Sequence, residues 1–129
     1  MSIVVVGSLS RDLTAVAPRI PKEGETILGS KFVRSFGGKG ANQAVMLSML
    51  GSSTNFVGMV GDDSNGNDYI EHFKSIGVAT EAISVTPDSP TGIAMISVSS
   101  TTGENSIIVV PGANGCLGGR EIEMNSSLL

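Results

Sequence analysis

Short apolar runs alternate with glycine-rich turns along the chain. Residues 3–6 form a continuous β-branched run that ends at Gly7, which is the pattern of a parallel strand buried on both faces. Residues 55–60 are mostly apolar and predict a second strand, which again meets glycine, at Gly58 and Gly61. Apolar side chains at helical spacing occupy residues 41–50 and 69–76. This order of strand, helix, strand and helix predicts an α/β fold.

The expected helices have recognisable ends. Gly51 and Gly77 follow the last apolar position of each helical pattern, where glycine commonly closes a helix. Ser64 precedes the second pattern and is expected to be its N-cap. Met46 and Met49 lie inside the first pattern and are expected to fill the core.

Two other stretches have the sequence pattern of β-ribbons. Residues 13–36 contain short apolar stretches separated by Pro18, Pro21, Gly24 and Gly29, which predicts turns between antiparallel strands. Residues 91–110 hold two apolar runs around a polar segment, which predicts a hairpin. We expect these two ribbons to pair in a small sheet separate from the α/β body.

Composition indicates a folded protein with little affinity for nucleic acid. Of 129 residues, 40% are apolar and 16% charged, unlike a disordered chain. Residues 1–40 hold six basic and three acidic side chains, whereas residues 41–129 hold two and nine. The basic residues form no run and aromatic residues are few, so we expect no nucleic-acid partner. A local site for a small anion remains compatible with this distribution.

Several other classes of protein are excluded by counts. Apolar runs reach only four residues, against the about 18 that a transmembrane helix needs. The first residues lack the basic and apolar regions of a secretory signal, so we expect no membrane partner and a location in the cytoplasm or nucleus. A single cysteine, Cys116, and a single histidine, His72, exclude an internal disulfide and a zinc site rich in these residues.

The segment that opens the first expected helix has the clearest chemistry. Gly37 and Gly38 allow backbone N–H groups to converge at the helix N-terminus, where the dipole favours anionic or oxygen-rich ligands. Lys39 adds a charged donor, Gly40 continues the turn, and Asn42 adds an amide. The spacing fits neither a Walker A loop nor a dinucleotide-binding fingerprint. From these residues alone, a ligand site and a tight turn with a solvated lysine remain alternatives.

Other polar residues are weaker candidates. Ser8, Ser10 and Asp12 follow the first strand, where open α/β sheets bind ligands, although a solvated polar turn would give the same pattern. The acidic pair at residues 62–63 is compatible with a metal ligand set but is more typical of a helix cap. His72 lies in an amphipathic helical pattern, and no second histidine or cysteine stands near it in sequence, which favours a surface or structural role.

The motifs resemble those of the PfkB-type carbohydrate kinases. Residues 37–44, GGKGANQA, with Gly51 and Gly61 downstream, are similar to the first signature of that family, and Lys39 with Gly40 resembles its ribokinase branch. Further similar segments are GS-x-x-x-D at residues 7–12, PxxGET at 21–26, GDDSNGNDYI at 61–70, TG at 91–92 and PGAN at 111–114.

The resemblance implies a fold and an activity. The fold would be a ribokinase-like three-layer α/β core, incomplete in this chain, with a small β-sheet lid made of two ribbons. The chain would be part of one kinase domain, with core pieces 1–12, 37–90 and 112–129 and lid strands 13–36 and 91–111. The activity would be phosphorylation of the 5-hydroxyl of D-ribose by ATP, with Mg²⁺ and a monovalent cation such as K⁺. Lids of this family commonly pair, which implies a homodimer.

The resemblance also implies which residues bind the sugar. Asp12 would accept hydrogen bonds from ribose hydroxyls, while Gly38, Lys39 and Asn42 would hold the sugar at the helix N-terminus. Ser10 stands where many ribokinases have asparagine, so its contact would be lost or pass through water. The full candidate set is Ser10, Asp12, Gly37, Gly38, Lys39, Gly40 and Asn42.

No catalytic residue is assigned within this sequence. Members of the family are longer and carry the catalytic aspartate in a glycine-rich GAGD segment, and no GxGD occurs here. We therefore expect the 129-residue chain alone to lack kinase activity, because the base and the donors to the phosphate are missing. The alternative function is a truncated, non-catalytic module that binds sugar or dimerises through its lid.

Overall fold

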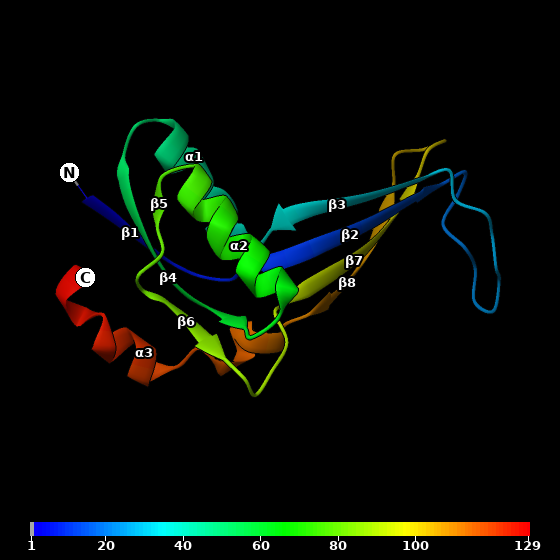
Figure 1. Cartoon of the computed structure of the whole chain (residues 1–129). Helices are drawn as coiled ribbons and strands as arrows, with labels where there is room; N and C mark the ends of the chain where they lie inside the picture. Colours follow the sequence, from blue (N-terminus) through cyan, green and yellow to red (C-terminus); the bar gives the residue numbers. More distant parts are fainter. Residues whose placement is uncertain (1) are drawn as a thin grey trace.

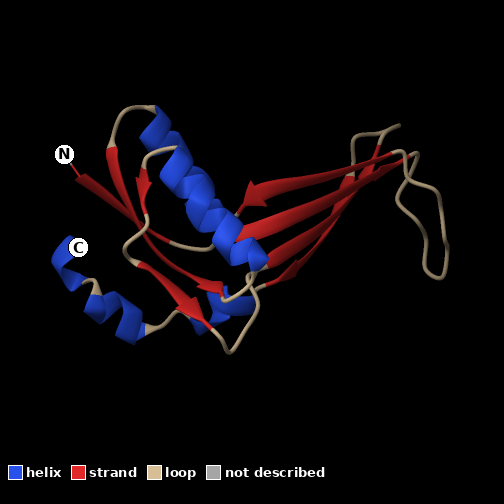
Figure 2. Ribbon diagram, in the orientation of Figure 1, coloured by secondary structure: helices blue, strands red, loops and turns tan. Residues whose placement is uncertain are grey.

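The computed structural model describes residues 2–129, which form two sheets with helices packed on the first (Figures 1 and 2). The elements are β1 (Ser2–Val6), β2 (Ser10–Ala17), β3 (Lys31–Gly37), α1 (Lys39–Met49), β4 (Ser53–Gly61), α2 (Ser64–Ser75), β5 (Val78–Ala79), β6 (Ile83–Thr86), β7 (Ile93–Ser99), β8 (Asn105–Val110), the 3₁₀ helix η1 (Gly112–Cys116), α3 (Gly119–Met124) and the 3₁₀ helix η2 (Ser126–Leu128). None of the helices in this described range is both long and apolar enough to cross a membrane.

The first sheet is parallel and is built around β4. This strand pairs with β1 on one side and with β5 and β6 on the other. Residues 56–61 of β4 are all buried, as a strand covered on both faces requires. The side chain of Phe56 packs edge-on against Phe73 of α2, with ring centroids 5.1 Å apart, and Ala41 and Ala44 of α1 join the same core. The expected α/β body is therefore present.

One expectation for this sheet is wrong. The apolar run of β1 was expected to be buried on both faces, but only Val5 is buried and Val6 is 45% exposed. The reason is that, within residues 2–129, β1 is an edge strand of the sheet and pairs only with β4. The short strands β5 and β6 were not anticipated; they pair with the edge of β4 and have little strand pattern of their own.

The second sheet contains both β-ribbons. Its order is β3-β2-β7-β8, with antiparallel pairing inside each ribbon and parallel pairing between β2 and β7. The expected separate sheet is thus present, and Figure 1 shows it extending away from the first. However, β2 begins at Ser10, which pairs with Gly37, so Ser10 and Asp12 lie within a strand and not in the turn that leaves β1.

The helix ends were predicted in part. Gly51 and Gly77 follow α1 and α2 with φ of 85° and 81°, the left-handed conformation expected of a closing glycine. The N-cap of α2 is Asp63 and not Ser64, because the Asp63 carboxylate accepts the Gly66 N–H. Met46 and Met49 were expected in the core but are 55% and 71% exposed, since the buried face of α1 consists of small residues.

Candidate functional site

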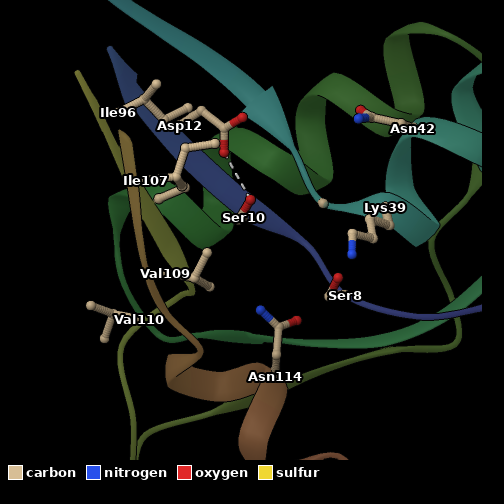
Figure 3. Close-up of a pocket in the computed structure, with 12 residues that line it drawn as sticks. Ser8, Ser10, Asp12, Lys39, Asn42, Ile96, Ile107, Val109, Val110 and Asn114 are labelled. Atoms are coloured by element: carbon tan, nitrogen blue, oxygen red, sulfur yellow. Dashed lines mark hydrogen bonds between the residues drawn. The ribbon is translucent and has the colours of Figure 1, made fainter. Parts of the chain in front are cut away.

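A pocket of about 450 Å³ lies between the second sheet and the N-terminus of α1 (Figure 3). One part of its wall is polar and comes from the segment between β1 and β2, from β2 itself and from the first turn of α1. Another part is apolar and comes from β7 and β8. The lining residues are Ser8, Ser10, Asp12, Gly38, Lys39, Asn42, Ala94, Ile96, Ile107, Val109, Val110 and Asn114.

Five of the seven candidate residues line this pocket, namely Ser10, Asp12, Gly38, Lys39 and Asn42. The other two, Gly37 and Gly40, are buried beside it. A Cβ on Gly37 would lie 2.2 Å from a carboxylate oxygen of Asp12, so glycine leaves the room that this carboxylate occupies. A Cβ on Gly40 would lie 2.8 Å from the Cα of Gly7, so glycine lets α1 approach the end of β1. These two glycines give the pocket its shape.

Gly38 forms the turn that starts α1. Its φ of 105° is one that residues with a side chain rarely adopt, and a Cβ there would lie 2.4 Å from the carbonyl oxygen of Ser8. Within the described residues no side chain caps this helix, and its first turn carries no acidic residue. The positive end of the helix dipole and the exposed Lys39 therefore both favour an oxygen-rich or anionic ligand at this end of the pocket.

Asp12 supplies the negative charge of the pocket. Its Oδ1 accepts a hydrogen bond from the Ser10 hydroxyl at 2.9 Å, which fixes the orientation of the carboxylate. A carboxylate has about four acceptor positions, so Asp12 keeps free capacity for hydroxyl donors. Lys39 and Asn42 come from a different element, α1, and Figure 3 shows them apart from Asp12 across the pocket. A ligand between them would meet an acceptor on one side and donors on the other.

The apolar wall was not anticipated from the sequence. Asp12 pairs in register with Ala94, and Ala94 pairs with Val109, so their side chains lie on the same face of the second sheet. Ile96 and Ile107 form the next pair on that face. The two apolar runs were visible in the sequence, but only the pairing of β2 with β7 brings these side chains to Asp12.

A second cluster lies at the joint between the second sheet and α2. The ring of Phe36 stacks on His72 with centroids 4.0 Å apart, and the Arg11 guanidinium carbon lies 4.1 Å from the Phe36 centroid. The Tyr69 hydroxyl donates to the Gly37 carbonyl oxygen. Burial, with a smaller contribution from Arg11, lowers the pKa of His72, and burial raises that of Tyr69. His72 thus packs between α2 and the second sheet, and it is not among the residues that line the pocket.

The acidic pair at residues 62–63 does not form a metal centre. The Asp63 carboxylate accepts hydrogen bonds from the Gly66 N–H and from both the N–H and the hydroxyl of Thr91. Burial alone raises the pKa of Asp63, but the bonds from Thr91 and Gly66 together bring it below its ordinary value. Across residues 2–129, no three His, Cys, Asp or Glu side chains are grouped so that they could hold a metal ion.

Comparisons with known proteins agree with this arrangement. Residues 1–129 match the family described as pfkB family carbohydrate kinase. Ribokinase from Mus musculus is 44% identical over 128 residues, which cover 99% of this chain and 39% of that protein. The chain thus spans about two fifths of that relative's length.

Solved structures of ribokinases share the fold. The structure of ribokinase from Giardia lamblia superposes with a TM-score of 0.90 at 36% identity, over 97% of this chain and 37% of that one. Ribokinase from Arabidopsis thaliana, complexed with ribose and ATP, superposes with a TM-score of 0.76 at 41% identity, over 86% of this chain and 36% of that one. The first sheet and its helices are therefore an incomplete ribokinase-like core, and the four-stranded second sheet extends from it.

Proposed function

The chain belongs to the pfkB family of carbohydrate kinases, and from that membership we propose that its pocket binds D-ribose and holds the 5-hydroxyl for phosphorylation by ATP. The observation that carries this proposal is the convergence of Asp12, Lys39 and Asn42, from two separate elements, on one pocket. These are the residues that the ribokinase resemblance assigns to the sugar. The ribose and ATP bound to the Arabidopsis thaliana relative support the same ligands.

The chemistry of the pocket suits a small polyol. The carboxylate of Asp12, oriented by Ser10, accepts hydrogen bonds from hydroxyl groups. The ammonium of Lys39 and the amide of Asn42 donate to hydroxyl oxygens from the opposite element. The apolar wall formed by Ile96, Ile107 and their neighbours covers the carbon-bound hydrogens of the sugar. Such a pocket fixes the direction of each hydroxyl, including the one that reacts.

The contribution of these residues to the reaction is positioning. Phosphoryl transfer depends largely on holding the attacking hydroxyl in line with the phosphate and on stabilising charge. Asp12 and Lys39 would set the place of the sugar, and hence of its 5-hydroxyl. ATP supplies the phosphoryl group. We propose that the nucleotide pocket and the base come from the part of the relatives' length that this chain does not span.

Mg²⁺ and K⁺ are proposed from the family resemblance alone. Mg²⁺ prefers oxygen ligands that carry negative charge. Because the acidic side chains of residues 2–129 do not gather into a metal-binding group, these residues do not fit a metal centre by themselves.

We also propose that the second sheet acts as a lid over the sugar and pairs with a second copy of the chain. Met95 and Ile108 are paired in register on the face opposite Ala94 and Val109, and they are 53% and 64% exposed. Phe32, on the same face, is 63% exposed. Exposed apolar side chains of this kind favour association. Sedimentation equilibrium of the chain and of the variant Ile108→Lys tests this pairing, with dimer expected for the former only.

The experiment that tests sugar binding is a titration of the chain with D-ribose, monitored by amide chemical shifts. Saturable shifts are expected at Asp12 and Lys39, and the variant Asp12→Ala should lose them. Asp68→Ala, which removes an exposed acid on α2, is the matched control and should bind as before. Absence of saturable shifts at the pocket would contradict the proposal.

The alternative function, a non-catalytic sugar-binding or lid-dimerising module, rests on the share of the relatives' length that the chain covers. A kinase assay distinguishes the ribose-phosphorylating function from this non-catalytic alternative. Ribose binding without ATP-dependent formation of ribose 5-phosphate is expected of the 129 residues alone. ATP-dependent product that disappears in Asp12→Ala would show that these residues are a kinase by themselves.

A further inference from the structure

Asn114 lines the pocket although no sugar contact is assigned to it. It lies in η1, directly after the second sheet, and Figure 3 shows its side chain beside Ser8. An amide in a sugar pocket would ordinarily be taken as a sugar ligand. Its hydrogen bonds point to a different role.

The amide of Asn114 is already engaged by the backbone. Its Oδ1 accepts the N–H of Leu9 at 2.9 Å, and its Nδ2 donates to the Leu9 carbonyl oxygen at 2.7 Å and to the Pro111 carbonyl oxygen at 3.0 Å. An asparagine amide has two N–H donors, and both are used here. Asn114 therefore has no donor left for a hydroxyl of the sugar.

Leu9 is the residue through which Asn114 acts on the pocket. It is fully buried and lies between Ser8 and Ser10, both of which line the pocket. The Ser8 carbonyl oxygen also accepts the N–H of Ala41 in the first turn of α1 at 3.3 Å. The position of Leu9 therefore sets the distance between the start of β2, which carries Asp12, and the start of α1.

The surroundings hold Asn114 in place. The N–H of Ala113 donates to the Pro90 carbonyl oxygen at 2.7 Å, and Ala113 is fully buried. A Cβ on Gly92 would lie 2.3 Å from Nδ2 of Asn114, so glycine at that position leaves room for the amide. The carbonyl oxygen of Gly92 in turn accepts the N–H of Arg11 at 2.8 Å. Asn114 thus joins η1 to the segment that precedes β2, and Ala113 joins it to the segment that precedes β7.

We propose that Asn114 is a positioning residue of the pocket. It holds Leu9 so that Ser10 and Asp12 keep the spacing from the α1 N-terminus that a pentose requires, and it does so without touching the sugar. This role rests on the proposed function, because it presupposes that the pocket binds ribose.

The test combines amide hydrogen exchange with ribose titration of the 129-residue chain. Asn114→Ala removes all three bonds, whereas Asn114→Asp keeps the acceptor for the Leu9 N–H and loses both donors. In both variants the dissociation constant for ribose is expected to rise about tenfold, the effect of one or two lost buried hydrogen bonds. In Asn114→Ala the Leu9 N–H should also exchange faster before any sugar is added.

Ser99→Ala is the matched control. The Ser99 hydroxyl donates to the Pro18 carbonyl oxygen at 3.1 Å, so it is likewise a side-chain link to a distant backbone group, but it lies outside the pocket lining. This variant should leave ribose affinity and Leu9 exchange unchanged. Unchanged affinity in folded Asn114 variants would overturn the proposal, as would weaker binding of Asn114→Ala with unaltered Leu9 exchange, which would indicate direct contact with the sugar.

The unsubstituted chain provides a test, by hydrogen exchange and amide resonances, that needs no variant. Ribose should slow exchange of the Leu9 N–H and leave the side-chain amide resonances of Asn114 in place. A large ribose-dependent shift of those resonances overturns the proposal even if neither variant folds. If the chain binds no ribose at all, the proposed function fails and this role fails with it, although the Leu9 exchange rate still reports whether the Asn114 bonds exist.

Discussion

Thr91 binds both carboxylate oxygens of Asp63. Its backbone N–H donates to Oδ2 at 2.8 Å and its hydroxyl donates to Oδ1 at 2.7 Å, while the hydroxyl oxygen accepts the N–H of Gly61 at 2.9 Å. Asp63 caps α2, Gly61 ends β4, and Thr91 precedes β7. One side chain therefore ties the central strand of the first sheet, the start of α2 and the base of the second sheet together.

Removal of the Thr91 hydroxyl should destabilise the protein. Thr91 is 2% exposed, so Thr91→Val leaves the Gly61 N–H buried without its acceptor and should lower the free energy of unfolding by about 1–3 kcal/mol. Urea denaturation followed by circular dichroism measures this change. Thr91→Ser keeps the hydroxyl and should retain most of the stability; equal losses in the two variants would count against a role for these hydrogen bonds.

Protonation of His72 should weaken the fold. Burial and the nearby Arg11 charge hold the pKa of His72 below its ordinary value, so the unfolded chain takes up the proton first, near pH 6.5. Neutral His72 therefore contributes its full share to the free energy of unfolding above that pH. This contribution declines as the pH falls below it. Unfolding by urea at pH 7, 6 and 5 measures the decline.

His72→Phe supplies the control for this pH dependence. Phenylalanine keeps an aromatic ring against Phe36 and has no proton to gain. The decline in stability between pH 7 and 5 should be smaller in this variant. An identical decline with and without His72 would assign the pH dependence to other groups.

Loss of the Lys39 charge should weaken ribose binding. Hydrogen bonds to charged donors are stronger than neutral ones, so Lys39→Met, which keeps the length of the side chain, should raise the dissociation constant about tenfold or more. Calorimetry or shift titration with ribose measures this. Lys31→Met removes an exposed lysine of β3 that does not line the pocket and should have no effect.

Gly38→Ala should be far more harmful than Gly51→Ala. Both glycines have positive φ, of 105° and 85°, so each substitution costs about 1 kcal/mol in backbone strain. A Cβ on Gly51 meets nothing within 4 Å, whereas one on Gly38 would lie 2.4 Å from the Ser8 carbonyl oxygen. We expect a total loss near 3 kcal/mol for Gly38→Ala. Equal melting temperatures for the two variants would contradict this account.

Much of the fold follows from local sequence patterns. The largely apolar pattern of β4, the helical spacing of α1 and α2 and the two hairpins were each predictable, because every one is specified by neighbouring residues. The N-cap of α2 was misplaced by one residue because Asp63 and Ser64 are both good caps, and the choice depends on Thr91, which lies far along the chain.

The candidate site was predictable only where a motif marks it. Asp12 and residues 37–42 carry recognisable chemistry. The apolar wall does not, since Val109 reaches Asp12 only through the register of β7 with both β2 and β8. Asn114 belongs to the PGAN segment, but it reaches Leu9 across 105 positions of sequence, so the motif does not indicate this partner. Long-range pairing of this kind leaves no local signal.

The parallel pairing of β2 with β7 bears on how the protein folds. Each ribbon of the second sheet pairs strands that are neighbours along that part of the chain, but the junction between the ribbons joins Arg11 to Ile93, with β3, α1, β4, α2, β5 and β6 between. Contacts between residues so far apart close slowly, because the chain between them must first be ordered. The pocket spans this junction, from Asp12 to Ile96. We therefore expect sugar affinity to be the last property that a refolding molecule regains, after its helices and its first sheet have formed.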